Sequence, residues 1–90
     1  MNLKIERTFT KDLKKIKDPV IRRAIADAIM EIQEAQRLSE VSNLKKLKSG
    51  ARMYYRKKIK DFRIGAELED QTVILVRVLP RKDIYKYFPK

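Results

Sequence analysis

Residues 53–79 read MYYRKKIKDFRIGAELEDQTVILVRVL, and this stretch determines the fold class of the chain. After Gly50, apolar residues recur at every second position, which is typical of strands that bury one face. Lys60-Asp61 and Glu69-Asp70 interrupt the alternation with polar residues that favour turns. Residues 71–79 are rich in β-branched side chains and predict a central, well-buried strand. The stretch therefore predicts three consecutive strands joined by short turns.

The first part of the chain changes from a strand pattern to a helical one. Alternating apolar residues predict a short strand over residues 2–7. Thr10 is a plausible N-cap for a short helix that ends near Lys17, and Asp18-Pro19 starts a second helix over residues 19–36. Its apolar residues share one helical face. They are Ile21, Ala24, Ile25, Ala28, Ile29 and Ile32.

Together these patterns predict an α+β fold of order β-α-α-β-β-β. Two N-terminal helices are expected to pack on one face of a mainly antiparallel four-stranded sheet. Residues 37–50 carry serine, asparagine and glycine and predict a connection. Residues 81–90 are too apolar to lie free in solvent. The chain has 90 residues, a length that predicts one domain over residues 1–90.

The chain is strongly basic, with a formal net charge of +11. Much of the excess lies in residues 45–63, which hold nine basic residues and one acidic residue, a net +8. Such a concentration favours phosphate-rich or acidic partners, although a charge run is often only a solvated surface. The chain contains no histidine and no cysteine. Any catalysis must therefore use cations and phenols, because imidazole and thiolate chemistry are excluded.

The sequence carries no membrane signal. Its longest uninterrupted apolar run, Val73–Val76, is far shorter than the roughly 20 residues that cross a bilayer. The start of the chain, Met1–Lys4, leads into alternating sequence without a hydrophobic signal region. We therefore expect a cytoplasmic protein without disulfides, and we predict neither a metal ion nor a cofactor.

Basic and aromatic motifs in the second half resemble those of the RelE/ParE superfamily of bacterial toxins, in particular its RelE-like branch. The resemblance rests on LKKLKSG at 44–50, YRKKIKDFR at 55–63 and RKDIY at 81–85. These match the family's Leu-Lys turn, its basic strand with a turn ending in Asp-aromatic-Arg, and its terminal Arg-x-Asp-Ile-Tyr. The order of predicted elements agrees over essentially the whole chain.

The resemblance implies the toxin of a type II toxin–antitoxin system that acts as an mRNA interferase. RelE-like toxins enter the ribosomal A site, cleave the bound mRNA and are held inactive by an antitoxin expressed beside them. The implied partners are mRNA on the ribosome and an acidic cognate antitoxin, and a heterotetramer of toxin and antitoxin is compatible with the family. The implied enzyme is a metal-independent endoribonuclease.

The family's functional residues carry over to particular positions of this chain. The implied catalytic residues are Arg56, Lys58, Arg63, Arg81 and Tyr85. Further basic residues are expected to contact RNA or to form a solvated surface. They are Lys45, Lys46, Lys48, Arg52, Lys57, Lys60 and Lys82.

These residue types suit RNA cleavage by the 2′-hydroxyl group. Arginine neutralises the charge that develops on the phosphate, because its planar donors bind phosphate oxygens and it stays charged. A lysine accepts a proton when neighbouring cations favour its neutral form, and Lys58 between Arg56 and Arg63 is the candidate base. Tyr85 could stack on a base, position the 2′-hydroxyl or share in proton transfer.

The sequence departs from the family at Lys57, where an apolar residue usually faces the helices, and at Lys60, where glycine is frequent. A bulge in the strand would exchange Lys57 and Lys58, so both remain candidates for the base at this stage. Arg56 and Arg63 could instead pair with an acidic residue such as Glu67.

Three functions remain open from the sequence. The first is the interferase. The second is a ParE-like toxin that binds DNA gyrase and has no nuclease activity, and the third is an RNA-binding module without catalysis. Retention of the cationic and tyrosine residues as a group favours the interferase. The helices before the three strands argue against a double-stranded RNA binder.

Overall fold

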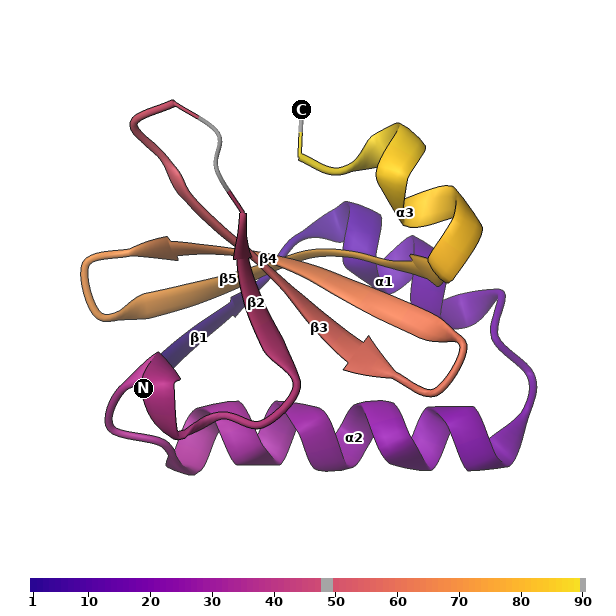
Figure 1. Cartoon of the computed structure of the whole chain (residues 1–90). Helices are drawn as coiled ribbons and strands as arrows, with labels where there is room; N and C mark the ends of the chain where they lie inside the picture. Colours follow the sequence, from indigo (N-terminus) through magenta and orange to yellow (C-terminus); the bar gives the residue numbers. More distant parts are fainter. Residues whose placement is uncertain (48–49, 90) are drawn as a thin grey trace.

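The computed structural model describes residues 1–47 and 50–89 and has an α+β architecture (Figure 1). The helices and strands follow one another along the chain. They are β1 (Asn2–Ile5), α1 (Arg7–Lys14), α2 (Pro19–Glu34), a 3₁₀ turn (Leu38–Glu40), β2 (Leu44–Leu47), β3 (Met53–Ile59), β4 (Phe62–Glu69), β5 (Thr72–Pro80) and α3 (Arg81–Tyr87).

The strands form a five-stranded sheet in the order β1-β5-β4-β3-β2. β1 runs parallel to β5, whereas β5, β4, β3 and β2 pair antiparallel in turn. The prediction of a mainly antiparallel sheet is therefore confirmed, but the predicted number of four strands is wrong by one. The additional strand is β2, within the segment expected to be a connection. Its sequence, LKKL, lacks period-two alternation because β2 is a short edge strand with its lysines exposed.

α1 and α2 cover one face of the sheet and enclose the main core, as Figure 1 shows for α2 below the strands. Asp18 caps α2 as predicted, since its carboxylate accepts a hydrogen bond from the N–H of Val20 at 2.9 Å. The predicted start of the first helix at Thr10 is wrong, because α1 begins at Arg7. Phe9 explains the earlier start: it is 1% exposed, and the first turn of α1 carries it into the core.

α3 lies on the opposite face of the sheet, where the sequence predicted only a tail that is not free in solvent (Figure 1). Ile84 and Phe88 are buried with Tyr54 in a second apolar cluster. The ring of Phe88 packs over Gly65, where an added Cβ atom would lie 2.6 Å from it. Gly65 therefore supplies the space that lets this segment lie flat on the sheet.

The tight turns and the surface agree with the strongly polar composition. Lys60 and Asp70 have positive φ angles of 51° and 56° in the turns that follow β3 and β4.

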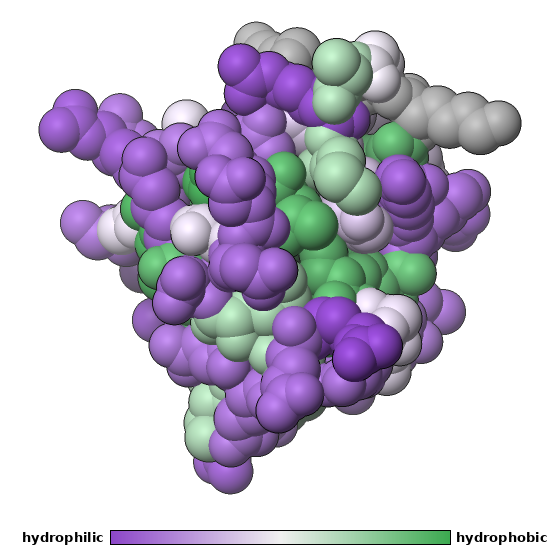
Figure 2. All heavy atoms as spheres, turned by 90° about the vertical axis from the view of Figure 1, so that its left-hand side faces the viewer, coloured by the Kyte–Doolittle hydropathy of each residue, from purple (hydrophilic) through white to green (hydrophobic). Residues whose placement is uncertain are grey.

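Hydrophilic side chains cover most of the end of the molecule shown in Figure 2, around a smaller hydrophobic area. Over residues 1–47 and 50–89, no helix has the length and hydropathy needed to span a bilayer.

Candidate functional site

A cleft of about 410 Å³ opens on the face of the sheet that carries α3. Its walls come from the segment before β2, from β2, β3 and β4, and from the first turns of α3. The lining residues are Val41, Asn43, Leu44, Lys45, Arg56, Lys58, Arg63, Arg81 and Tyr85. All the residues implied to be catalytic therefore line one cleft, although they come from separate strands and a helix.

Strand geometry explains how the cationic side chains meet. Arg56 and Lys58 lie two positions apart on β3 and so project from the same face of the sheet. Lys58 is paired with Arg63 of β4 in the antiparallel register, which places these two cations beside each other. The N–H of Arg81 donates a 2.8 Å hydrogen bond to the carbonyl of Asp61. This bond holds the start of α3 at the turn between β3 and β4.

Tyr85 lies against the cations of the cleft. The guanidinium carbon of Arg56 is 4.5 Å from the centre of the Tyr85 ring, a cation–π contact. A hydrogen bond from Arg81 lowers the pKa of the Tyr85 phenol below its ordinary value, and the charges of Arg56, Arg81 and Arg63 act in the same direction. The side chain is exposed, so its hydroxyl group remains accessible to a ligand. The surroundings of Tyr85 thus favour its ionised form.

The arginines of the cleft do not pair with Glu67. Arg63 donates from Nη1 to the carbonyl oxygens of Lys60 at 2.9 Å and Phe62 at 2.8 Å. Glu67 instead forms an ion pair of 2.6 Å with Arg52, a residue predicted to contact RNA. The alternative in which Glu67 neutralises Arg56 or Arg63 is therefore wrong. Backbone carbonyls orient the side chain of Arg63. Because carbonyl groups are uncharged, they do not neutralise its positive charge.

Lys57 lies on the opposite face of the sheet from the cleft. It is 3% exposed, and its Nζ atom donates to Glu31 Oε1 at 2.9 Å and to the carbonyl of Ser42 at 2.6 Å. The register of β3 with β4 runs without a bulge from Met53 to Ile59, so Lys58 and not Lys57 faces the cleft. The predicted role of Lys57 as an RNA contact or base is thus corrected: it is a buried ion-pair residue.

The remaining basic residues predicted to contact RNA are distributed unevenly. Lys45 lines the cleft and is paired with Arg56 in the register. Lys46 is exposed and projects from the other face of β2, Lys60 occupies the turn after β3, and Lys82 is exposed on α3. Lys48 lies outside the described residues.

The wall formed by Val41, Asn43 and Leu44 was missed by reasoning from the sequence. These residues lie in the segment predicted as a connection. The turn-forming pair Ser42-Asn43 was the only sequence signal for an unusual backbone conformation there. Asn43 has a positive φ of 55°.

A cluster of carboxylates suited to a metal ion is not found among the described residues. The donor set of the cleft is instead cationic and phenolic, which suits a phosphate-containing ligand.

Comparison with known proteins agrees with this architecture. Residues 3–85 match the family described as ParE toxin of type II toxin-antitoxin system, parDE. The chain is 41% identical to Toxin RelE3 of Methanocaldococcus jannaschii over 90 residues, which are 99% of this chain and 100% of that protein.

Solved structures give the same result for the fold. The toxin in the RelB–RelE antitoxin–toxin complex from Methanococcus jannaschii is 41% identical and superposes with a TM-score of 0.79 over 96% of this chain and 99% of the other. The archaeal RelE–RelB complex from Pyrococcus horikoshii OT3 contains a chain of 20% identity with a TM-score of 0.70, covering 89% of this chain and 93% of that one. The second likeness supports the fold alone.

Proposed function

Because this chain belongs to the RelE/ParE superfamily of type II toxin–antitoxin toxins, we propose that it is an mRNA interferase that cleaves ribosome-bound mRNA. The observation that carries the proposal is the convergence of Arg56, Lys58, Arg63, Arg81 and Tyr85 in one open cleft. Cations and a phenol match the needs of a reaction in which RNA supplies its own nucleophile.

In the proposed reaction, the 2′-oxygen attacks the adjacent phosphorus and the bond from phosphorus to the 5′-oxygen breaks. The products are a 2′,3′-cyclic phosphate and a 5′-hydroxyl group. Arg63 and Arg81 stabilise the charge that develops on the phosphate oxygens. Lys58 and Tyr85 share the removal and return of the proton, and Arg56 holds Tyr85 through the 4.5 Å cation–π contact. No metal ion takes part in this scheme, because the guanidinium groups supply the positive charge.

The proposal is tested by mapping transcripts after the toxin is induced in a bacterial host. Primer extension is expected to reveal discrete cuts within translated codons. The competing function is binding of DNA gyrase by a ParE-like toxin, and residues 3–85 match the family described as ParE toxin. DNA breaks without mRNA cuts would contradict the interferase and support the gyrase inhibitor.

The lowered pKa of Tyr85 gives a prediction about pH. An ionised phenol accepts a proton, so the rate of cleavage should rise as pH increases through this pKa, which lies below the ordinary value of about 10. Tyr85→Phe keeps the ring but removes the ionising group. The variant should cleave about 100-fold more slowly and lose the corresponding limb of the pH profile.

Single-turnover cleavage rates of wild type and Tyr85→Phe between neutral and alkaline pH provide the measurement. Tyr87→Phe is the matched control, since Tyr87 is also an exposed tyrosine of α3 but does not line the cleft. An unchanged pH profile in Tyr85→Phe would remove this tyrosine from proton transfer.

We also propose an acidic antitoxin as the partner that keeps the toxin inactive. The net charge of +11 favours an acidic partner at long range, and Tyr85 and Tyr87, 56% and 44% exposed, offer apolar contacts on α3. The relative of 41% identity is a toxin solved in an antitoxin–toxin complex, which supports the same kind of partner here.

Coexpression of the toxin with the small open reading frame beside its gene should yield a stable complex. Because charge attraction accelerates encounter, the association rate is expected to fall by about tenfold or more between low and high salt. Surface-bound toxin and purified partner would give the rate directly. Absence of an acidic partner, together with a toxin that is harmless when produced alone, would contradict the proposal.

A further inference from the structure

Asn43 lines the cleft with a neutral amide, whereas most of the other polar lining residues are cations. It is exposed, and none of the hydrogen bonds within the described part of the chain uses its side-chain amide. We infer that Asn43 is a specificity-determining residue whose amide reads the edge of an RNA base held in the cleft. The inference rests on the proposed function and goes beyond it, because it concerns which codons are cut.

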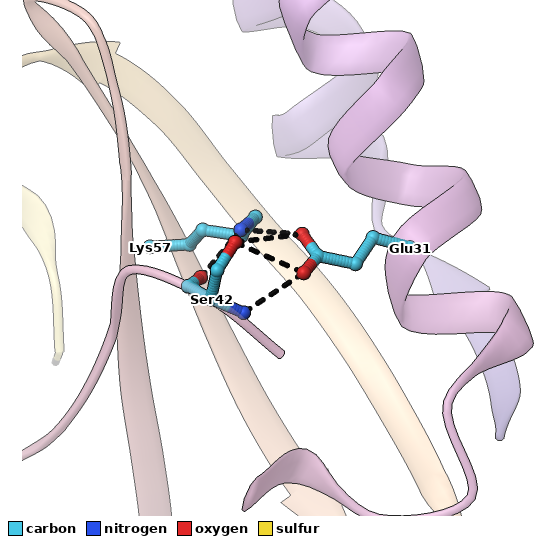
Figure 3. A network of polar contacts seen from close by, with 3 residues as sticks. All are labelled: Glu31, Ser42 and Lys57. Atoms are coloured by element: carbon cyan, nitrogen blue, oxygen red, sulfur yellow. Dashed lines mark hydrogen bonds and ion pairs between the residues drawn. The ribbon is translucent and has the colours of Figure 1, made fainter. Parts of the chain in front are cut away.

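The backbone around Asn43 is fixed from several sides, which a reading residue requires. The N–H of Ser42 donates to Glu31 Oε2 at 2.8 Å, and the Ser42 carbonyl accepts from Lys57 Nζ at 2.6 Å (Figure 3). A hydrogen bond from Ser42 leads the effects that hold the pKa of Glu31 below its ordinary value, so this carboxylate stays charged. The network therefore joins the residue before Asn43 to both α2 and β3.

On its other side, Asn43 is held by the sheet itself. Its carbonyl accepts a 2.9 Å hydrogen bond from the N–H of Lys58, the candidate base. Leu44, the next residue, is paired with Lys57 at the start of β2. Asn43 is thus held at a fixed position relative to Lys58. A base that hydrogen-bonds to Asn43 would therefore fix the position of the phosphate to be cleaved relative to Lys58.

The other polar residues of the cleft are poorly suited to distinguish bases. Arg63 donates to backbone carbonyls, Arg56 lies over Tyr85, and Arg81 hydrogen-bonds to Tyr85. Lysines act as point charges toward phosphate, and Tyr85 can stack on a base of any identity. Among the described lining residues, Asn43 alone carries a neutral amide, which presents a donor beside an acceptor. This pattern complements an amino group beside a ring nitrogen, which adenine and cytosine share.

If Asn43 served only to fix the backbone conformation, Asn43→Gly would keep the wild-type codon preference. Its φ of 55° lies in the left-handed region, which asparagine tolerates better than most residues and glycine adopts freely. Asn43→Gly preserves this backbone and removes the amide. Asn43→Asp keeps the shape but leaves only acceptors, which match the two donors on the Watson–Crick edge of guanine.

The experiment uses purified ribosomes programmed with synthetic mRNAs that carry a randomised triplet in the A site, and sequences the fragments cut by each variant. Wild type should prefer adenine or cytosine at one position of the triplet by roughly fivefold or more. Asn43→Gly should lose that preference, and Asn43→Asp should shift it toward guanine. Ratios among triplets within one variant cancel any general loss of rate.

Lys45→Ala is the matched control from the same wall, and it should slow all cuts alike without changing the preference. Wild-type preference in both Asn43→Gly and Asn43→Asp would overturn the inference and leave the interferase intact. Absence of any cut by wild type would instead overturn the proposed function, and the inference with it. The randomised triplet also decides between adenine and cytosine.

Discussion

Replacement of Arg81 by alanine is expected to slow mRNA cleavage by about 10² to 10³, or about 2.7 to 4 kcal/mol of transition-state stabilisation. Arg81 lines the cleft at the start of α3, where a 2.8 Å backbone hydrogen bond to Asp61 holds it near β3 and β4. The guanidinium group is matched to phosphate oxygens and stays charged throughout the reaction. Arg63→Ala should have a similar effect, and the double variant should cleave below detection.

The measurement is the single-turnover rate on ribosome-bound mRNA. Lys58→Ala should also be severe, because it removes the candidate base. Lys46→Ala should be mild, because Lys46 projects from the other face of β2 and does not line the cleft. A folded Arg63→Ala, Arg81→Ala double variant that cleaves at the wild-type rate would exclude the mechanism.

A large effect on stability is expected at Asp12. Its carboxylate is 5% exposed and accepts bonds from Arg77 Nε at 2.7 Å and Nη2 at 3.0 Å, and from the N–H of Val78 at 3.1 Å. Asp12→Ala leaves this N–H without its acceptor and Arg77 without its counter-charge. Removing one partner of a buried ion pair costs about 3 to 5 kcal/mol. Because Arg77 is 21% exposed and can regain some hydration, we expect about 3 kcal/mol.

Urea unfolding followed by circular dichroism would measure this loss as a lower midpoint with an unchanged slope. Asp27→Ala is the matched control. Asp27 also pairs with an arginine, Arg23, but the two side chains are 64% and 81% exposed. An exposed pair of this kind contributes less than about 0.5 kcal/mol. Equal losses in the two variants would show that burial does not decide the strength of the Asp12 pair.

Local patterns predicted the parts of the fold in which one face of an element is buried. The alternation in β3 and β4 predicted strands that each bury one face, because a strand in a half-buried sheet has only one register that buries its apolar face. It left both Lys57 and Lys58 open as candidates for the base, and the register of β3 with β4 is what places Lys58 on the side of the cleft. The cap at Asp18 was equally predictable, since it depends on adjacent residues. The family motifs then identified residues that the structure brings together in one cleft.

Features that depend on contacts between distant parts of the chain could not be predicted from local sequence patterns. β2 is an edge strand whose pairing with β3 leaves little period-two signal. α3 forms because Ile84 and Phe88 pack against the sheet, where the ring of Phe88 lies over Gly65. Lys57 resembles a surface lysine in the sequence, but it is buried because Glu31 of α2 lies within 2.9 Å. Each case needs the tertiary partner to be known.

The chemistry of the cut ends tests the central claim most directly. Purified toxin is mixed with ribosomes carrying an mRNA of defined A-site codon, and both fragments are analysed by mass spectrometry. Attack by the 2′-hydroxyl group predicts a 2′,3′-cyclic phosphate on one fragment and a 5′-hydroxyl group on the other, both absent with the Arg63→Ala, Arg81→Ala double variant. Intact mRNA with the wild-type toxin, or fragments ending in a 3′-hydroxyl group and a 5′-phosphate, would contradict the account.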